Sequence, residues 1–259
     1  MSLLSVRHIS KRFAGVAAVS DVSFDVQAGE LLALIGPNGA GKSTCFNMLN
    51  GQLKPDSGQV ILDGVDVVGK SPRQVWKHGV GRTFQIAATF GSMTVLENVQ
   101  LALHSYRSGV FAAWQAMSHS HQQDALSLLQ QVGMHEHADR PCSVLAYGDV
   151  KRVELAVALS NQPKLLLMDE PTAGMAPKER SELIALTKRL VIERRIGALF
   201  TEHSMDVVFG YADRMIVLAR GKLIAEGEPN AVRADPRVQE AYFGTGKTFT
   251  NEQLEGATA

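Results

Sequence analysis

The chain is poor in three features that mark particular classes of protein: cysteine, excess charge and long apolar runs. Its 259 residues include two cysteines, Cys45 and Cys142, which stand in no Cys-x-x-Cys pattern and predict buried thiols rather than a disulfide or a metal pair. Lys and Arg number 26, as do Asp and Glu. The formal charge is therefore zero, which disfavours a nucleic-acid binder because such proteins usually carry a basic excess.

Membrane spans and secretion signals are also missing. No apolar run reaches the roughly 18 residues of a membrane-spanning helix, and the N-terminus lacks a signal-peptide pattern. We therefore expect a soluble, cytoplasmic protein. The length suits one large domain, or a core domain with an inserted lobe.

The most informative segment joins an apolar run, 31–35, to a helix-like segment, 45–50, through a glycine-rich turn. The turn comprises Gly36, Pro37, Asn38, Gly39, Ala40, Gly41, Lys42, Ser43 and Thr44, which match the pattern G-x-x-x-x-G-K-[ST]. Small residues allow backbone amides to surround a polyphosphate, and a helix N-terminus adds about half a positive charge. Lys42 supplies a full charge, and the Ser43 hydroxyl can complete a magnesium shell. The segment predicts binding of a nucleoside triphosphate.

The order of apolar patterns predicts an α/β fold. Strand-like runs are expected at 3–9, 22–26, 31–35, 60–62, 165–168, 198–201 and 215–218, and a helix at 177–195. Between them, about 94–160 has helical spacing and opens with a capping box, Thr94-x-x-Glu97. Strands that alternate with helices indicate a largely parallel sheet. A helical lobe is inserted midway.

The run 165–168 ends in two carboxylates, Asp169 and Glu170. A fully apolar run fits a strand buried on both faces, and ligands of open α/β sheets lie beyond the carboxyl ends of such strands. Asp169 then suits magnesium, directly or through water, and Glu170 suits a general base that polarises the attacking water. The alternative is two solvated carboxylates that open a turn before Pro171.

Two further residues become informative only in combination with the phosphate loop. His203 follows the apolar run 198–201, where its side chain could reach a γ-phosphate, although a lone histidine is more often structural. Gln85 follows Thr83-Phe84 and carries an uncharged donor and acceptor that can touch metal or water.

In chain order, 36–44, Gln85, 145–149, 165–170 and His203 resemble the Walker A, Q-loop, signature, Walker B and switch-histidine motifs of ATP-binding cassette proteins. The resemblance covers about 3–244. It implies a P-loop NTPase core with a mostly parallel sheet, an N-terminal antiparallel β subdomain and an inserted α-helical subdomain. The implied nucleotide-binding domain is 1–244, with the insertion at about 94–160 and a flexible tail at 245–259.

The resemblance also implies site roles and an ATPase activity that requires ATP and Mg²⁺. Glu170, His203 and Lys42 would be catalytic, and Ser43, Gln85 and Asp169 would serve the metal. The signature residues Leu145, Ala146, Tyr147, Gly148 and Asp149 would face the nucleotide of a second subunit. The implied partners are transmembrane permease subunits and an identical or paralogous ATPase, with a periplasmic solute-binding protein acting indirectly. The implied location is the cytoplasmic face of the membrane.

Segments 12–15, 82–85, 145–148, 173–175 and 241–244 narrow the match to ATPase subunits of branched-chain amino acid importers, which they resemble. In that family Phe13 would stack on adenine, for which a flat π-face is suited; the alternative is a core phenylalanine. Urea, amides and aromatic acids also stay open as solutes. Competing functions are a non-transport cassette ATPase of DNA repair or translation, and a regulatory subunit without turnover.

Three positions depart from the family pattern: Ala146 where serine is frequent, Asp149 where glutamine is usual, and Ala176 where an acidic residue or asparagine is usual. Asp149 would cap a helix expected at 150–159. A carboxylate that faced the phosphate would instead repel it. From this we derive the hypothesis of a heterodimer with two unequal composite sites.

Overall fold

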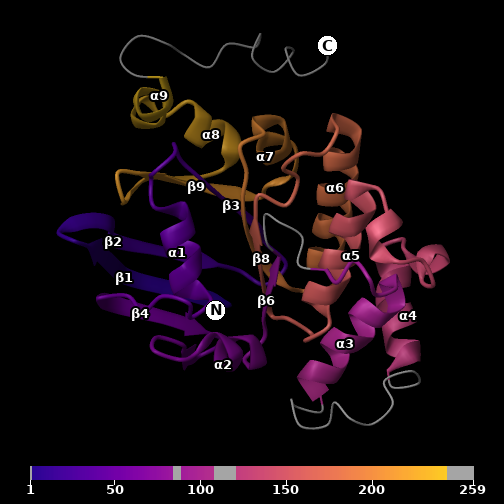
Figure 1. Ribbon diagram of the computed structural model, residues 1–259. Coiled ribbons are helices and arrows are strands. Elements are labelled where there is room, and N and C mark those ends of the chain that lie inside the picture. The colour runs from indigo at the N-terminus through magenta and orange to yellow at the C-terminus, as the bar shows by residue number, and fades with distance from the viewer. Residues whose placement is uncertain (1, 84–88, 108–120, 244–259) are drawn as a thin grey trace.

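The computed structural model describes residues 2–83, 89–107 and 121–243 (Figure 1). Within them, an antiparallel sheet has the strand order β2-β1-β4-β5. Its strands are β1 (Leu4–Phe13), β2 (Val16–Val26), β4 (Ser57–Leu62) and β5 (Val65–Asp66). Two-residue turns, Ala14-Gly15 and Asp63-Gly64, join the hairpins with positive φ at every position, as tight hairpin turns require. The expected N-terminal antiparallel subdomain is confirmed.

A second, larger sheet has the order β10-β9-β3-β8-β7-β6 among the described residues. Its strands are β3 (Leu31–Ile35), β6 (Val80–Thr83), β7 (Leu165–Asp169), β8 (Gly197–Thr201), β9 (Arg214–Ala219) and β10 (Lys222–Gly227). The neighbours from β9 to β6 pair in parallel, and only β10 runs antiparallel within this described sheet. The predicted mostly parallel sheet is confirmed.

The larger sheet is covered on both faces. Leu32 and Leu34 of β3 pack with α1 (Lys42–Leu49) and the antiparallel sheet, whereas Leu31 and Ala33 pack against the later helices. Successive side chains of a strand point to opposite faces, so each inner strand contributes to both cores. In Figure 1, α1 lies on the side of the small sheet, and α5 and α6 lie on the other side. Burial on both faces explains the continuous apolar runs.

The described helices outside the middle lobe are α1, α2 (Pro72–Lys77), α6 (Pro177–Arg194), α7 (Met205–Tyr211), α8 (Pro229–Arg233) and α9 (Pro236–Phe243). Four of them, α2, α6, α8 and α9, begin at a proline. Pro177 opens α6 as expected, because its fixed φ suits a first helical turn. Ser71 caps α2 and forms a reciprocal capping box with Gln74.

The middle of the chain forms a group of helices beside the sheets (Figure 1). They are α3 (Val95–Arg107), α4 (Gln122–Gln131) and α5 (Tyr147–Leu159), with short 3₁₀ turns His135–His137 and Cys142–Val144. The capping box before α3 is present: the Thr94 amide donates to the Glu97 carboxylate at 2.7 Å, and the Glu97 amide donates to the Thr94 hydroxyl at 3.1 Å. The helices therefore lie within 94–160, as the helical spacing indicates.

The two cysteines, Cys45 and Cys142, are free and buried, as the sequence predicts. Burial raises the pKa of the Cys45 thiol to about 12. None of the described helices combines the length and the apolar character that crossing a bilayer requires.

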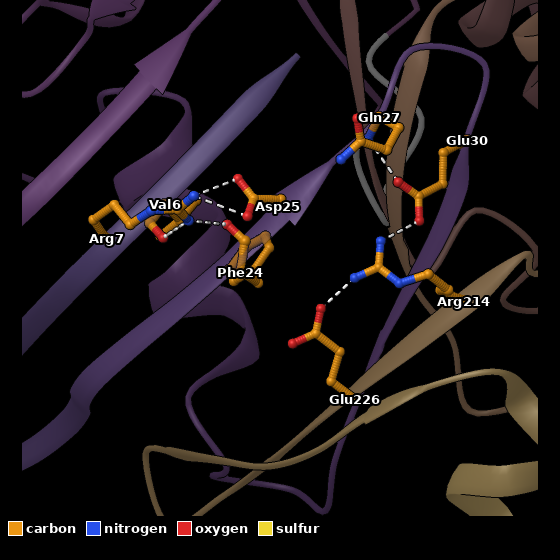
Figure 2. Close-up of polar contacts among 8 residues, drawn as sticks. All are labelled: Val6, Arg7, Phe24, Asp25, Gln27, Glu30, Arg214 and Glu226. Carbon is orange, nitrogen blue, oxygen red and sulfur yellow. Dashed lines mark hydrogen bonds and ion pairs between the residues drawn. The ribbon is translucent and has the colours of Figure 1, made fainter. Parts of the chain in front are cut away.

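Ion pairs join neighbouring strands in each of the two sheets (Figure 2). Arg214, the first residue of β9, forms ion pairs with Glu30, which precedes β3, and with Glu226 of β10. On the small sheet, Arg7 of β1 forms two hydrogen bonds with Asp25 of β2, at 2.8 and 2.9 Å. The contacts of Arg214 therefore lie at the amino ends of the parallel strands and do not occupy their carboxyl ends.

Candidate functional site

The turn between β3 and α1 requires glycine where other strands press against it. A Cβ at Gly36 would lie 2.2 Å from the carbonyl oxygen of Leu218, and a Cβ at Gly41 would lie 2.3 Å from that of Ala18. α1 begins at Lys42 and has no acidic residue in its first turn. Its first amides have no intrahelical acceptor, so they suit an anion that no carboxylate of that turn repels.

Lys42 lies over this loop. Its Nζ donates to the carbonyl oxygens of Gly36, at 2.6 Å, and Pro37, at 3.3 Å, and the residue is 9% exposed. Burial lowers the pKa of Lys42, while the charges of Glu170 and Asp169 raise it. The two predicted carboxylates therefore lie close enough to the loop lysine to interact with it electrostatically.

Asp169 lies at the carboxyl end of β7, opposite Thr201 of β8. The Thr201 hydroxyl donates to Asp169 Oδ1 at 2.8 Å, and Arg82 Nη2 lies 3.6 Å from Oδ2. Arg82 also donates to the side-chain oxygens of Asn47, at 3.1 Å, and Gln52, at 3.0 Å. Both oxygens of Asp169 thus have a protein partner, which orients the carboxylate before any metal binds.

Glu170 adopts a left-handed backbone conformation, with φ of 48°. Its amide donates to the carbonyl oxygen and the hydroxyl of Thr201, at 3.2 and 3.0 Å. Its Oε1 lies 2.9 Å from Nε2 of His203. Strained non-glycine backbone tends to occur at functional sites, where the surrounding structure maintains it. Here it turns the acid towards the histidine.

Three more predicted residues remain, of which Phe13 and Ser43 are described and one lies outside the described chain. Phe13 ends β1 and is 48% exposed, with Lys11 Nζ 5.9 Å from its ring centroid. The alternative of a core phenylalanine is therefore wrong. Gln85 lies outside the described residues. Ser43 is exposed, on the first turn of α1.

Comparison with known proteins identifies the family. A family model described as ABC transporter matches residues 19–173, more than half of the chain. The chain belongs to the ABC transporter family. As a member of this family of ATP-binding cassettes it is an ATPase. A second model, described as branched-chain amino acid ATP-binding cassette transporter, matches residues 222–248 of this ABC protein.

Curated relatives of this ABC ATPase match almost end to end. The high-affinity branched-chain amino acid transport ATP-binding protein LivG of Escherichia coli strain K12 is 39% identical over 249 residues, which cover 93% of this chain and 98% of LivG. BraF of Pseudomonas aeruginosa, with the same description, is 36% identical over 249 residues, 93% of this chain and 98% of BraF.

Solved structures share the fold of this ABC ATPase. A nucleotide-free ATP-binding cassette from an ABC transporter superposes with a TM-score of 0.84 at 32% identity, covering 94% of this chain and 100% of that one. An ATP-binding cassette in its ADP conformation gives 0.85 at 33% identity, covering 94% and 99%. A bacterial cassette described as dimeric gives 0.74 at 26% identity, covering 87% and 98%.

The signature segment departs from its expectation. α5 begins at Tyr147 rather than at 150, so Asp149 lies in the first helical turn and does not cap the helix. Ala146 is the N-cap and forms no side-chain bond. The N-terminus of α5 packs against α6: a Cβ at Gly148 would lie 3.4 Å from the Glu179 carboxyl carbon. A carboxylate in a first turn also interacts favourably with the helix dipole.

Sequence reasoning missed three side chains that support the centre: Arg82 and Thr201, which bind Asp169, and Glu202, which is 4% exposed. In the sequence, Arg82 stands out only as part of the family segment 82–85. A signal exists for the other two, because Thr201 ends the apolar run that precedes His203 and Glu202 follows it. The expectation that residues at strand ends form the site applies to them as it does to His203.

Proposed function

We propose that this ABC ATPase hydrolyses Mg-ATP at the phosphate loop and thereby powers an importer of branched-chain amino acids. The convergence of Lys42, Asp169, Glu170 and His203 beside the loop supports the chemistry. Lys42 and the amides of 36–44 would bind the phosphates. Glu170 would accept a proton from the attacking water, and His203 would stabilise the γ-phosphate.

Magnesium fits the oxygen donors at this position. A hydroxyl on the first turn of α1, from Ser43, and a carboxylate, from Asp169, are the ligand types that magnesium takes beside a phosphate. Gln85 is proposed as a further ligand of metal or water. The metal would neutralise phosphate charge; Asp169, already oriented by Thr201 and Arg82, would hold it directly or through water.

The nature of the solute rests on the relatives. LivG and BraF are named as branched-chain amino acid transport proteins, and the model matching 222–248 carries the same substrate class. We therefore propose branched-chain amino acids as the transported solute, in preference to urea, amides or aromatic acids. Residues 1–244 would form the nucleotide-binding domain, with 94–160 as its inserted helical subdomain. The ATPase would associate peripherally with permease subunits at the cytoplasmic face of the membrane.

The signature of this chain supports a heterodimer with unequal sites. Two cassettes would close around two ATP molecules, each nucleotide facing the α5 N-terminus of the opposite subunit. Asp149 places a carboxylate in that first turn, and Ala146 has no hydroxyl to donate. Negative charge there opposes binding of a γ-phosphate. Ala176 likewise lacks the polar group expected across the interface. This chain would therefore pair with a paralogue whose signature is complete.

Phosphate release by the purified chain tests the activity. We expect Mg²⁺-dependent hydrolysis of ATP, alone or with the paralogue, that a chelator abolishes. Absence of magnesium-dependent nucleotide binding in both preparations would exclude the proposed site.

An Asp149→Gln variant tests the asymmetry. Turnover should rise in the heterodimer, because the repulsion at the weaker site is removed. Glu136→Gln, which removes a charge from the exposed 3₁₀ turn of the same lobe, is the matched control and should change nothing. If the isolated chain is fully active and Asp149→Gln has no effect, the two sites are equivalent and the asymmetry is refuted.

Reconstitution with the permease subunits and their binding protein tests the solute. Leucine, isoleucine or valine should stimulate ATP hydrolysis in proteoliposomes, whereas urea, amides and aromatic acids should not. Stimulation by one of those other solutes instead would assign a different importer, with the same ATPase chemistry.

A further inference from the structure

Glu202 is a buried carboxylate to which the proposed mechanism gives no role. It is 4% exposed and directly follows β8. Its Oε1 accepts hydrogen bonds from the amide of Thr172, at 3.0 Å, and from the hydroxyl of Thr172, at 2.6 Å. Its Oε2 accepts one from the amide of His203, at 3.2 Å. A carboxylate removed from water at this depth needs such donors, because burial without them is costly.

The groups that approach Glu202 favour its charged form. Burial raises the pKa of Glu202 above its ordinary value, and the donors from Thr172, Ser204 and His203 offset only part of that rise. Each of these contacts offers hydrogen to an oxygen, which is the arrangement that an ionised carboxylate accepts. Thr172 itself is 1% exposed, so both partners of the bond are fixed within the core.

The bond joins two loops, each of which carries a proposed catalytic side chain. Thr172 lies two residues after Glu170 in the loop that follows β7, and Glu202 directly precedes His203 in the loop that follows β8. Glu170 Oε1 and His203 Nε2 lie 2.9 Å apart. The Glu202–Thr172 contact therefore links the two loops that carry the base and the histidine.

A neighbouring residue anchors the start of the same loop. Thr201 binds Asp169 Oδ1 and the amide of Glu170, whereas Glu202 binds Thr172. Between these points lies Pro171, which has no amide hydrogen to donate. Consecutive residues of the β8 terminus therefore hold successive points of the β7 loop on either side of that proline.

We propose that Glu202 is a positioning residue for the hydrolytic step. By binding Thr172, it holds the side chains of Glu170 and His203 in place relative to each other. This proposal rests on the roles proposed above for those two side chains. Glu202 touches neither nucleotide nor water in this scheme. Its loss should therefore reduce turnover without weakening nucleotide binding.

Glu202→Gln and Thr172→Val are the two test variants. The amide of glutamine has one accepting end, so it cannot accept from Thr172 and His203 together. We expect kcat to fall about tenfold in each variant, the effect of losing one hydrogen bond to a charged group, with KM for ATP unchanged. Thr172→Ser keeps the hydroxyl and should recover most of the kcat that Thr172→Val loses. Because the two residues are in contact, the double variant should lose less than the two single losses combined.

Thr187→Val is the matched control, since Thr187 is also 1% exposed and its hydroxyl donates to Leu183 at 2.8 Å within α6. It should leave kcat unchanged. If Glu202→Gln does not fold, the Thr172→Val and Thr172→Ser pair decides alone. A folded wild type without turnover refutes the proposed function. Positioning by Glu202 is refuted if the wild type is active and the Thr172→Val variant keeps its kcat, or if serine fails to restore it.

Discussion

Nε2 of His203 lies 2.9 Å from Oε1 of Glu170, although 33 residues separate them in the chain. Two adjacent parallel strands, β7 and β8, bring the two residues together, and Glu170 itself has a left-handed backbone conformation. The side chain of His203 is 54% exposed and that of Glu170 is 20% exposed, so solvent reaches the pair mainly at the histidine. A proton acceptor with that access suits activation of water.

Replacement of Glu170 by glutamine should separate binding from hydrolysis. The amide keeps the shape but cannot accept a proton, so kcat should fall by about a hundredfold or more while ATP affinity is kept. Phosphate release and binding of a fluorescent ATP analogue measure the two quantities. Glu240→Gln, on the surface of α9, is the charge-matched control. Near-normal turnover in Glu170→Gln would exclude this residue as the base.

Loss of the Phe13 ring should weaken nucleotide binding selectively. Aromatic stacking contributes about 0.5–1.5 kcal/mol, so Phe13→Ala should raise the Kd for ATP roughly threefold to tenfold. Turnover at saturating ATP should not change. Phe13→Trp should restore affinity, and Val16→Ala, at a more exposed apolar position 71% accessible to solvent, is the control. Equal affinities of the alanine variant and the wild type would remove Phe13 from the site.

Arg82→Gln should destabilise the fold. Its guanidinium bridges Asp169, Asn47 and Gln52, and its side chain is 12% exposed. Removal of a partner leaves poorly solvated acceptors, which costs about 1–3 kcal/mol. Urea unfolding measures the change. Arg73→Gln, at an exposed position of α2, should change the free energy of unfolding by no more than about 0.5 kcal/mol. Similar values for both variants would contradict a structural role of the Arg82 bridge.

The ion pair between Arg7 and Asp25 should make stability depend on acid (Figure 2). Burial raises the pKa of Asp25, but hydrogen bonds from Arg7, Ser5 and Ser2 outweigh it and hold the pKa below the ordinary 3.8. Because the folded-state pKa is the lower one, ionised Asp25 stabilises the fold above pH 3.8, and this contribution is lost as the pH falls through the depressed pKa.

Asp25→Asn should therefore lower the unfolding temperature at neutral pH and converge with the wild type below the depressed pKa. The two side chains are 41% and 32% exposed, so solvent screens the pair and the loss should stay under about 1 kcal/mol. Thermal unfolding across the acid range measures it. A difference that persists unchanged in acid would point to packing rather than charge.

Elements whose signals are local were predicted well. β3 was expected at 31–35 and found there, and α6 begins at Pro177, since an apolar run and a proline start need only neighbouring residues. β6 (Val80–Thr83) was not predicted. It contains Gly81 and Arg82 and forms a strand because it pairs with β7, a segment about 85 residues further along the chain. Such long-range pairing overrides weak local preference.

The candidate site divides in the same way. Lys42 and the pair Asp169 and Glu170 stand in motifs that reveal their chemistry locally. Thr201, Glu202 and Arg82 are ordinary residue types that acquire a role only through contacts made across the sheet. The spacing of these residues along the chain does not predict those contacts.

The family, the phosphate loop and the acids that follow β7 can be recognised from short segments of sequence, because glycine pattern, apolar run and charge are local properties. The orientation of Asp169 by Thr201 and Arg82, and the position of Asp149 in the first turn of α5, become visible only in the folded chain. This is because the orientation of a side chain depends on the register of neighbouring strands and on packing between helices. Both are set by segments distant in the chain.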